Sequence, residues 1–205
     1  MHHCVYSQVD KSFKYDQLGE QAKFRNAKVS YYVADFSWAK AQLDVLKGST
    51  SKLIANDAME LSLLITDNTG LDSNEIAMQM FARADLRIYQ NNKYKAWTIL
   101  DSITTTFPGH ALADEVLMRK YQISLKQNNL ENAEQFLLQV LKDHPTDITA
   151  DNATFYLAEL YEGPLNNKEK AMEKYQDLLL NYPNSMFVVE ARKRFRLIRG
   201  DNLEQ

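Results

Sequence analysis

The sequence contains one cysteine, few glycines and prolines, and no long apolar run. Its 205 residues include one Cys, six Gly and four Pro. Because Cys4 has no second cysteine, an internal disulfide and a CxxC motif are both excluded. Apolar stretches fall short of the roughly 18 residues of a transmembrane helix, so no membrane span is expected. Residues 1–5, MHHCV, lack the apolar core of a signal peptide, and the compartment stays open.

The sequence also lacks motifs that carry catalysis. There is no glycine-rich phosphate loop and no HExxH, and catalysis needs converging groups. The acidic pair Asp114–Glu115 is better explained by the attraction of acids to the positive end of a helix. His2, His3 and Cys4 could bind a metal, but a frayed terminus is the simpler interpretation. We therefore expect no enzyme, no cofactor and no metal site.

Most glycines and prolines lie between segments whose apolar residues recur at helical spacing. Glycine suits the left-handed position after a helix, and proline cannot continue one. No run alternates apolar and polar residues for long enough to predict a strand. We expect ten helices, joined by short turns and therefore antiparallel to their neighbours. They span roughly 16–33, 36–47, 52–66, 74–90, 93–107, 110–127, 130–144, 148–162, 167–182 and 185–199.

Three segments align on a small residue. They read NNKYKAWTILDSITTTFP, NNLENAEQFLLQVLKDHP and NNKEKAMEKYQDLLLNYP. Ala96, Ala133 and Ala171 each precede a proline by twelve residues, and large residues follow at plus four and plus seven. A small residue lets two helices approach closely, and the large ones extend the same stripe into the contact. Stacked helix pairs of this kind bury a continuous core.

These features resemble the tetratricopeptide repeat family, which combines a helical hairpin, a small residue in the second helix and a terminal proline. The resemblance covers about residues 16–199 and implies an all-α, right-handed superhelix of antiparallel hairpins. Residues 1–15 then form a tail or leader, and residues 200–205 a C-terminal tail. The turns are similar to those of bacterial cell-envelope proteins of the outer-membrane assembly lipoprotein and Tol-Pal-associated types. That likeness implies the periplasm or cell envelope, with the cytoplasm as the alternative.

The first part of the chain departs from the regular repeat. DFSWAKAQLDVLKGSTS matches through Ala39, but Ser51 stands where proline should be. Ala39 and Ala96 are 57 residues apart, about one helix too many. We expect an irregular junction near residues 66–74, followed by a capping box in which Asp72 and Glu75 satisfy the start of the next helix.

The resemblance also implies a binding surface, because the family's first helices line a concave groove that holds a peptide or partner helix. Met118 and Phe155 fall at equivalent positions and are interpreted as apolar anchors, with packing on a neighbouring helix as the alternative. If they are anchors, Met118→Glu with Phe155→Glu should keep the fold and lose binding. In the first repeat, Phe24 stands where the chaperone-binding carboxylate clamp has a basic residue, so chaperone binding is not expected. The concave positions are Glu115, Met118, Gln122, Leu125, Asn152, Phe155, Glu159 and Glu162.

The last helix is strongly basic, although the whole chain carries a net charge of −3. Positive charge near a helix C-terminus complements its dipole, and a polar outer face suits a terminal repeat, which favours a true C-terminus here. The alternative is a site for an anionic ligand, nucleic acid or an acidic partner; nucleic acid is not expected as the main partner. The patch consists of Arg192, Lys193, Arg194, Arg196 and Arg199.

The sequence therefore predicts a non-enzymatic interaction scaffold that binds a protein segment through the concave face of the repeats. The first alternative is an assembly role within a larger envelope protein, including self-association. The second is anionic-ligand or nucleic-acid binding through the basic last helix.

We predict that Ala133→Leu and Ala171→Leu each destabilise the protein, because a close helix approach has no room for added volume. Thermal unfolding monitored by circular dichroism checks this. Melting temperatures no lower than that of the wild type would contradict the repeat register.

Overall fold

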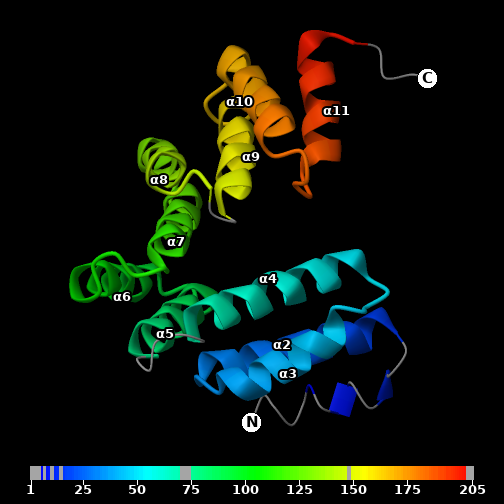
Figure 1. The fold of residues 1–205 in the computed structure, drawn as a ribbon, viewed down its shortest axis with the longest axis vertical. Coiled ribbons are helices and arrows are strands. Elements are labelled where there is room, and N and C mark those ends of the chain that lie inside the picture. The colour runs from blue at the N-terminus through cyan, green and yellow to red at the C-terminus, as the bar shows by residue number, and fades with distance from the viewer. Residues whose placement is uncertain are drawn as a thin grey trace. The chain divides into compact units, whose positions relative to one another are not determined.

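The computed structural model describes residues 6, 8–9, 12–13, 16–69, 75–146 and 149–201 (Figure 1). All ten elements in these ranges are helices, and no strand occurs among them, which confirms the all-α fold class. The helices are α2 (Gln17–Tyr32), α3 (Phe36–Leu46), α4 (Lys52–Thr69), α5 (Ile76–Tyr89), α6 (Lys93–Thr106), α7 (Ala113–Lys126), α8 (Leu130–Asp143), α9 (Thr149–Glu162), α10 (Lys168–Asn181) and α11 (Val188–Arg199).

Within the single domain predicted over residues 16–199, the chain forms two compact units. The N-terminal unit spans Met1–Leu112 and the C-terminal unit spans Ala113–Gln205. The two units are described separately below.

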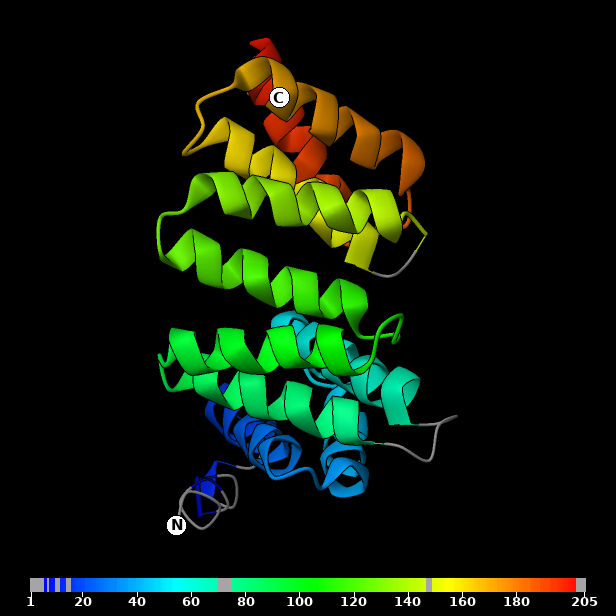
Figure 2. The ribbon, with the colours of Figure 1, turned by 90° about the vertical axis from the view of Figure 1, so that its left-hand side faces the viewer.

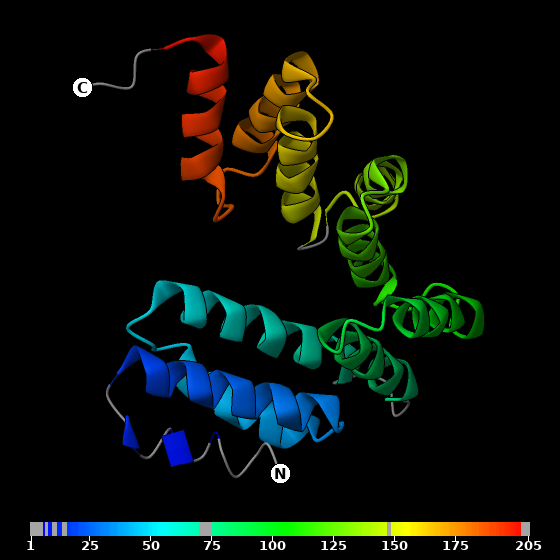
Figure 3. The same cartoon turned by 180° about the vertical axis from the view of Figure 1, so that it is seen from behind.

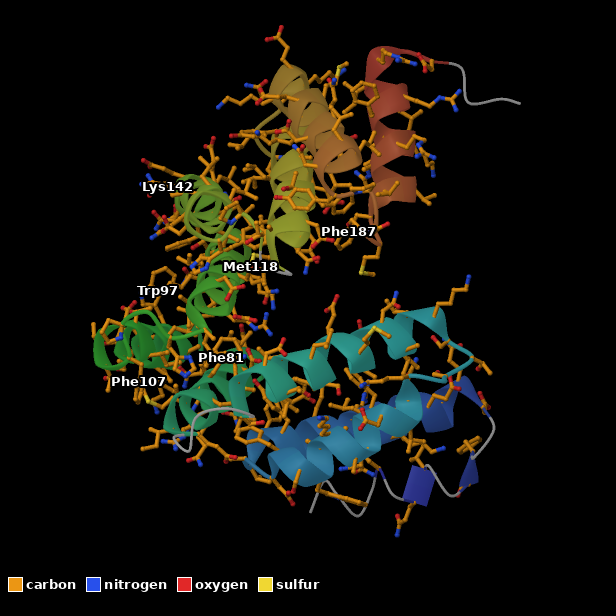
Figure 4. All side chains as sticks on the ribbon, viewed as in Figure 1. Phe81, Trp97, Phe107, Met118, Lys142 and Phe187 are labelled. Carbon is orange, nitrogen blue, oxygen red and sulfur yellow. The ribbon has the colours of Figure 1, made fainter. Side chains whose placement is uncertain are left out.

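The helices from α2 to α6 in the described part of the N-terminal unit form two hairpins and one additional helix. α2 pairs with α3, and α5 pairs with α6 (Figure 2). α4 packs along α3 and also contacts α2 and α5, as Figure 3 shows from behind. The buried side chains of the N-terminal unit include Phe81 of α5 (Figure 4) and Tyr31 of α2. The Tyr31 hydroxyl donates a hydrogen bond to Asp85 Oδ2 at 2.9 Å. The additional helix is therefore α4, which follows one hairpin without starting the next.

The described residues of the C-terminal unit form two hairpins followed by a single helix. α7 pairs with α8 and α9 with α10, while α8 packs on α9 and α11 packs on α10. Ala133 and Ala171 are 0% exposed, as are Ala39 and Ala96 in the other unit. A leucine at such a position overpacks the contact at a cost of about 1–3 kcal/mol. The large residues that follow are buried as well: Leu43, Leu46, Leu100, Ile103, Leu137, Val140, Tyr175 and Leu178.

The connection in each of the four hairpins ends with the same kind of residue pair, which the sequence analysis did not anticipate. The first turn residue has a positive φ; these residues are Ala34, Asn91, Asn128 and Asn166, with φ between 47° and 63°. The second caps the following helix, because its side chain accepts a hydrogen bond from the backbone N–H three residues later. Asp35 caps α3, Asn92 caps α6, Asn129 caps α8 and Asn167 caps α10. The repeated NN dipeptide was the signal for this turn.

The predicted helix boundaries hold within three residues, and the largest differences are at the starts of α7 and α11 and at the end of α4. α7 begins at Ala113 rather than 110, because His110 lies in the preceding turn and its Nδ1 accepts a hydrogen bond from Leu112 N–H at 3.1 Å. α4 continues to Thr69, and the predicted junction at 66–74 otherwise lies outside the described residues. The capping box is not observed: Asp72 lies outside the described residues, and Glu75 is itself the N-cap without a side-chain hydrogen bond.

We predict that Ala34→Gly stabilises the protein by about 1 kcal/mol, because φ at Ala34 is 63° and a side chain with Cβ is strained there. Asn128→Gly is the matched control, since asparagine already tolerates this conformation and its replacement should change stability much less. Chemical denaturation of the three proteins measures the difference. An Ala34→Gly variant that is less stable than the wild type would contradict the strain at this turn.

Candidate functional site

α9 supplies half of the predicted concave surface, and small residues set its orientation. Ala150, Ala153 and Ala158 are fully buried, which lets α9 lie close to its neighbours α8 and α10. Asn152, Phe155, Glu159 and Glu162 are spaced by three or four residues along the helix, so they share one side of it. That side also meets α10, because Phe155 and Glu162 both contact Tyr175. The structure thus places these four residues on one side of α9, as the spacing predicts.

The two predicted apolar anchors are core residues. Met118 is 4% exposed and Phe155 is 5% exposed, and both belong to the hydrophobic core of the C-terminal unit. The Phe155 ring stacks on Phe187, which precedes α11, with ring centroids 4.4 Å apart and an interplanar angle of 10°. Both side chains pack against other residues of the same chain, so the alternative interpretation, packing on a neighbouring helix, is correct. Met118→Glu with Phe155→Glu is now expected to unfold the unit.

Glu159 and Glu162 are held by the last helix. Arg194 of α11 lies 3.3 Å from Glu159 Oε1, 3.1 Å from Glu162 Oε2 and 2.9 Å from Glu190 Oε1. Glu162 Oε2 also accepts a hydrogen bond from the Tyr175 hydroxyl at 2.6 Å. Burial raises the pKa of Glu159, and the positive charge of Arg194 opposes that rise. These carboxylates therefore already have a basic partner, and Arg194 fastens α11 to α9.

Glu115 lies at the start of α7 beside Asp114. Burial, followed by the adjacent Asp114 carboxylate, raises the pKa of Glu115 to about 9. Burial also tends to raise the pKa of Asp114, but hydrogen bonds from Glu115, Thr149 and the backbone lower it overall. The Thr149 hydroxyl donates to Asp114 Oδ2 at 2.6 Å. Asp114 Oδ1 and Glu115 Oε2 are buried and accept no hydrogen bond from other described groups. A proton on Glu115 supplies the donor that this pair lacks.

Three of the predicted residues retain accessible surface. Leu125 is 39% exposed at the end of α7, and Gln122 and Asn152 are half-buried. Leu125 is the apolar member of this group, since Gln122, Asn152 and the partly accessible Glu159 are polar. In the N-terminal unit, Phe24 and Lys28 contact each other, with Lys28 Nζ 5.8 Å from the Phe24 ring centroid.

The predicted basic patch is partly neutralised. Arg194 is occupied by the glutamates described above, and Arg196 and Arg199 both pair with Asp201 just after the helix. Arg192 and Lys193 remain exposed on α11. With three of five charges engaged, α11 offers a weaker attraction for a polyanion than the sequence suggested.

Among the described residues, no group of three or more His, Cys, Asp or Glu side chains is arranged to hold a metal ion. His2, His3 and Cys4 lie outside the described residues. The same ranges contain no helix that combines the length and apolar character needed to cross a membrane.

The family model for the tetratricopeptide repeat matches residues 152–185. This stretch covers nearly all of α9, the whole of α10 and the following turn, so the sequence match coincides with one hairpin of the C-terminal unit. The match supports a tetratricopeptide repeat protein. Comparison with curated proteins gives no match.

The sequence analysis missed the residues that join α11 to the repeat before it. Phe187 and Arg194 carry this contact. The spacing of Glu190 and Arg194, four residues apart on one helix, was a visible signal for a salt bridge. Their long-range partners Phe155 and Glu159 were assigned to the groove, because counting positions does not reveal which helix covers a side chain.

We predict that the protein becomes less stable as pH rises from about 5 to about 9, and that Glu115→Gln reduces this dependence. The pKa of Glu115 in the folded state is about 9, above its ordinary value, so the folded state keeps a proton that the unfolded state releases. The stabilisation is complete below the ordinary pKa and is lost as pH rises through the folded one. Glutamine mimics the protonated carboxyl group, so the variant should gain stability over the wild type at high pH.

Denaturant unfolding at several pH values measures this effect, with Glu131→Gln at an exposed position of α8 as the control. An unchanged pH dependence in Glu115→Gln would show that Glu115 is ionised in the folded state.

Proposed function

We propose that this chain is a non-enzymatic scaffold that binds a segment of a partner protein along the first helices of its C-terminal unit. The match of residues 152–185 to the tetratricopeptide repeat carries the proposal, because proteins of this family typically act as interaction scaffolds without catalysis. The proposed surface runs from Gln122 and Leu125 of α7 to Asn152 and Glu159 of α9. The other predicted positions do not belong to this surface, because they are buried or have partners within the chain. They are Glu115, Met118, Phe155 and Glu162.

The chemistry of this surface favours a partner that forms hydrogen bonds more than one that inserts large apolar groups. Met118 and Phe155 offer almost no surface. The amides of Gln122 and Asn152 can donate and accept hydrogen bonds, as an extended backbone or an amide side chain requires. Leu125, 39% exposed, is the one apolar contact in this set. Few hydrophobic anchors predict modest affinity and selection through polar contacts.

We infer a bacterial envelope setting from the turns between repeats, which are similar to those of envelope proteins of this family. The resemblance is the support for this setting. Fractionation of the source cell, followed by detection of the protein with a specific antibody, tests it. Recovery in the cytoplasmic fraction alone would contradict it.

We predict that Leu125→Lys abolishes partner binding while Leu138→Lys preserves it. The two leucines are matched, with 39% and 42% exposure, but Leu138 lies on α8, a second helix of a hairpin. A lysine at the proposed surface buries an unpaired charge in the complex, so the affinity should fall at least tenfold, or about 1.4 kcal/mol.

The wild-type protein is immobilised and exposed to extract of the source cell, and retained proteins are identified by mass spectrometry. The affinity of the purified partner for each variant is then measured by calorimetry. Equal affinity of both variants, with both folded by circular dichroism, would place the binding surface elsewhere.

A further inference from the structure

Two helices of this protein have no hairpin partner among the described residues. α2 pairs with α3, α5 with α6, α7 with α8 and α9 with α10, whereas α4 and α11 each stack on a preceding hairpin. α4 packs on α3 as α9 packs on α8, but the helix after α4 pairs with α6 instead. α4 and α11 therefore occupy the place of a first helix whose second helix is missing.

The repeat register shows which side of each helix is left uncovered. Nine, twelve and sixteen residues after Pro145 stand Thr154, Leu157 and Tyr161 of α9. All three are buried, at 2%, 0% and 4% exposure, in the core formed with the neighbouring helices. In a complete repeat these positions thus belong to the packed side of the first helix.

In α4 the same positions are exposed and acidic at both ends. Ser51 stands where the proline of the repeat should be, and nine, twelve and sixteen residues after it come Glu60, Leu63 and Asp67. All three are exposed, and Leu63 keeps 38% of its surface. Met59, one residue before Glu60, is also exposed at 46%. We name Met59, Glu60, Leu63 and Asp67 the α4 face; it is apolar in its middle and negative at each end.

In α11 the same positions are basic at both ends. Nine, twelve and sixteen residues after Pro183 come Arg192, Phe195 and Arg199. Both arginines are exposed, and Phe195 is half-buried against the core of the unit. Arg196, beside Phe195, is exposed as well. We name Arg192, Phe195, Arg196 and Arg199 the α11 face. It is apolar in its middle, and each end keeps a net positive charge, because Arg196 and Arg199 share the single carboxylate of Asp201.

The two faces match in spacing as well as in charge. Glu60 and Asp67 are seven residues apart, and so are Arg192 and Arg199. Seven residues correspond to about 10 Å along a helix axis, or two turns, so each charged pair lies on one side of its helix. Leu63 and Phe195 occupy the same place between the charges. An antiparallel pair of the two helices brings Glu60 opposite Arg199 and Asp67 opposite Arg192.

We propose that the protein self-associates, with the α4 face of one copy packed against the α11 face of a second copy. Each copy then supplies the missing hairpin partner of the other. The contact joins two different surfaces, so two copies can close a symmetric dimer through two such contacts, or copies can add head to tail. One helix pair buries less than the roughly 1,200–2,000 Å² of a stable interface, so the association is weak and reversible.

We predict a mass above that of the monomer as protein concentration rises from low micromolar towards millimolar, measured by sedimentation velocity. The association should weaken with added salt, because it depends on exposed charges. Reversing the charges of either face, by Glu60→Arg with Asp67→Arg or by Arg192→Glu with Arg199→Glu, should weaken it at least about tenfold. Lys142→Glu, at an exposed site on α8 (Figure 4), is the control and should associate like the wild type.

A mixture of the two charge-reversed proteins gives the decisive measurement. Each reversed protein carries two faces of the same sign and should stay monomeric alone. Together they restore opposite signs between copies, so the mixture should associate about as strongly as the wild type. If a reversed variant fails to fold, Glu60→Gln with Asp67→Asn and Arg192→Gln with Arg199→Gln replace the reversals, with a smaller loss expected for each protein alone.

A monomer mass at every concentration overturns the proposal, including the case in which the two faces meet within one chain. Association that survives both reversals, or a mixture that stays monomeric, overturns it as well. The result is independent of partner binding, because Leu125 belongs to neither face and Leu125→Lys should self-associate like the wild type.

Discussion

Close approach of helices at four buried alanines is the constraint on which the hairpins depend. Ala39, Ala96, Ala133 and Ala171 have no exposed surface, and each lies early in the second helix of a hairpin. Because a methyl group takes so little room, the two helices meet there, and the large residues one and two turns later fill the widening space. This contact therefore recurs in all four hairpins of the described residues, although the rest of their sequences differ.

The C-terminal unit is held together by side chains that reach from one repeat to the next. Glu134 of α8 accepts a hydrogen bond from the Tyr161 hydroxyl at 2.5 Å and lies 3.5 Å from Lys170 Nζ, so one carboxylate connects three successive helices. Arg194 connects α11 to α9 in a similar way. Contacts of this kind couple neighbouring repeats, since a repeat array is stabilised by its interfaces as much as by its individual hairpins.

The periodicity of the sequence was sufficient to predict the helices, but it was not sufficient to predict which side chains of the proposed groove are exposed. The ten helices and the packing of Ala133 with Leu137 follow from spacing along one helix, which the sequence contains directly. The burial of Phe155 does not, because it depends on Phe187, which lies beyond the next hairpin helix and reaches α9 only in the folded chain. Likewise, Glu159 looks like a free carboxylate until Arg194 is placed beside it. The groove was therefore predicted with core residues as its anchors.

The turn shared by the hairpins has a consequence for chemical ageing. Asn92, Asn129 and Asn167 each cap a helix through a side-chain oxygen, and the first hairpin uses Asp35 for the same bond. Asparagine and aspartate are about equally good N-caps, and a negative charge there also suits the helix dipole. Hydrolysis of one of these side-chain amides to aspartate would thus leave the capping oxygen in place and give that hairpin the residue that the first hairpin already has. The repeat tolerates at these sites a covalent change that would damage a buried amide.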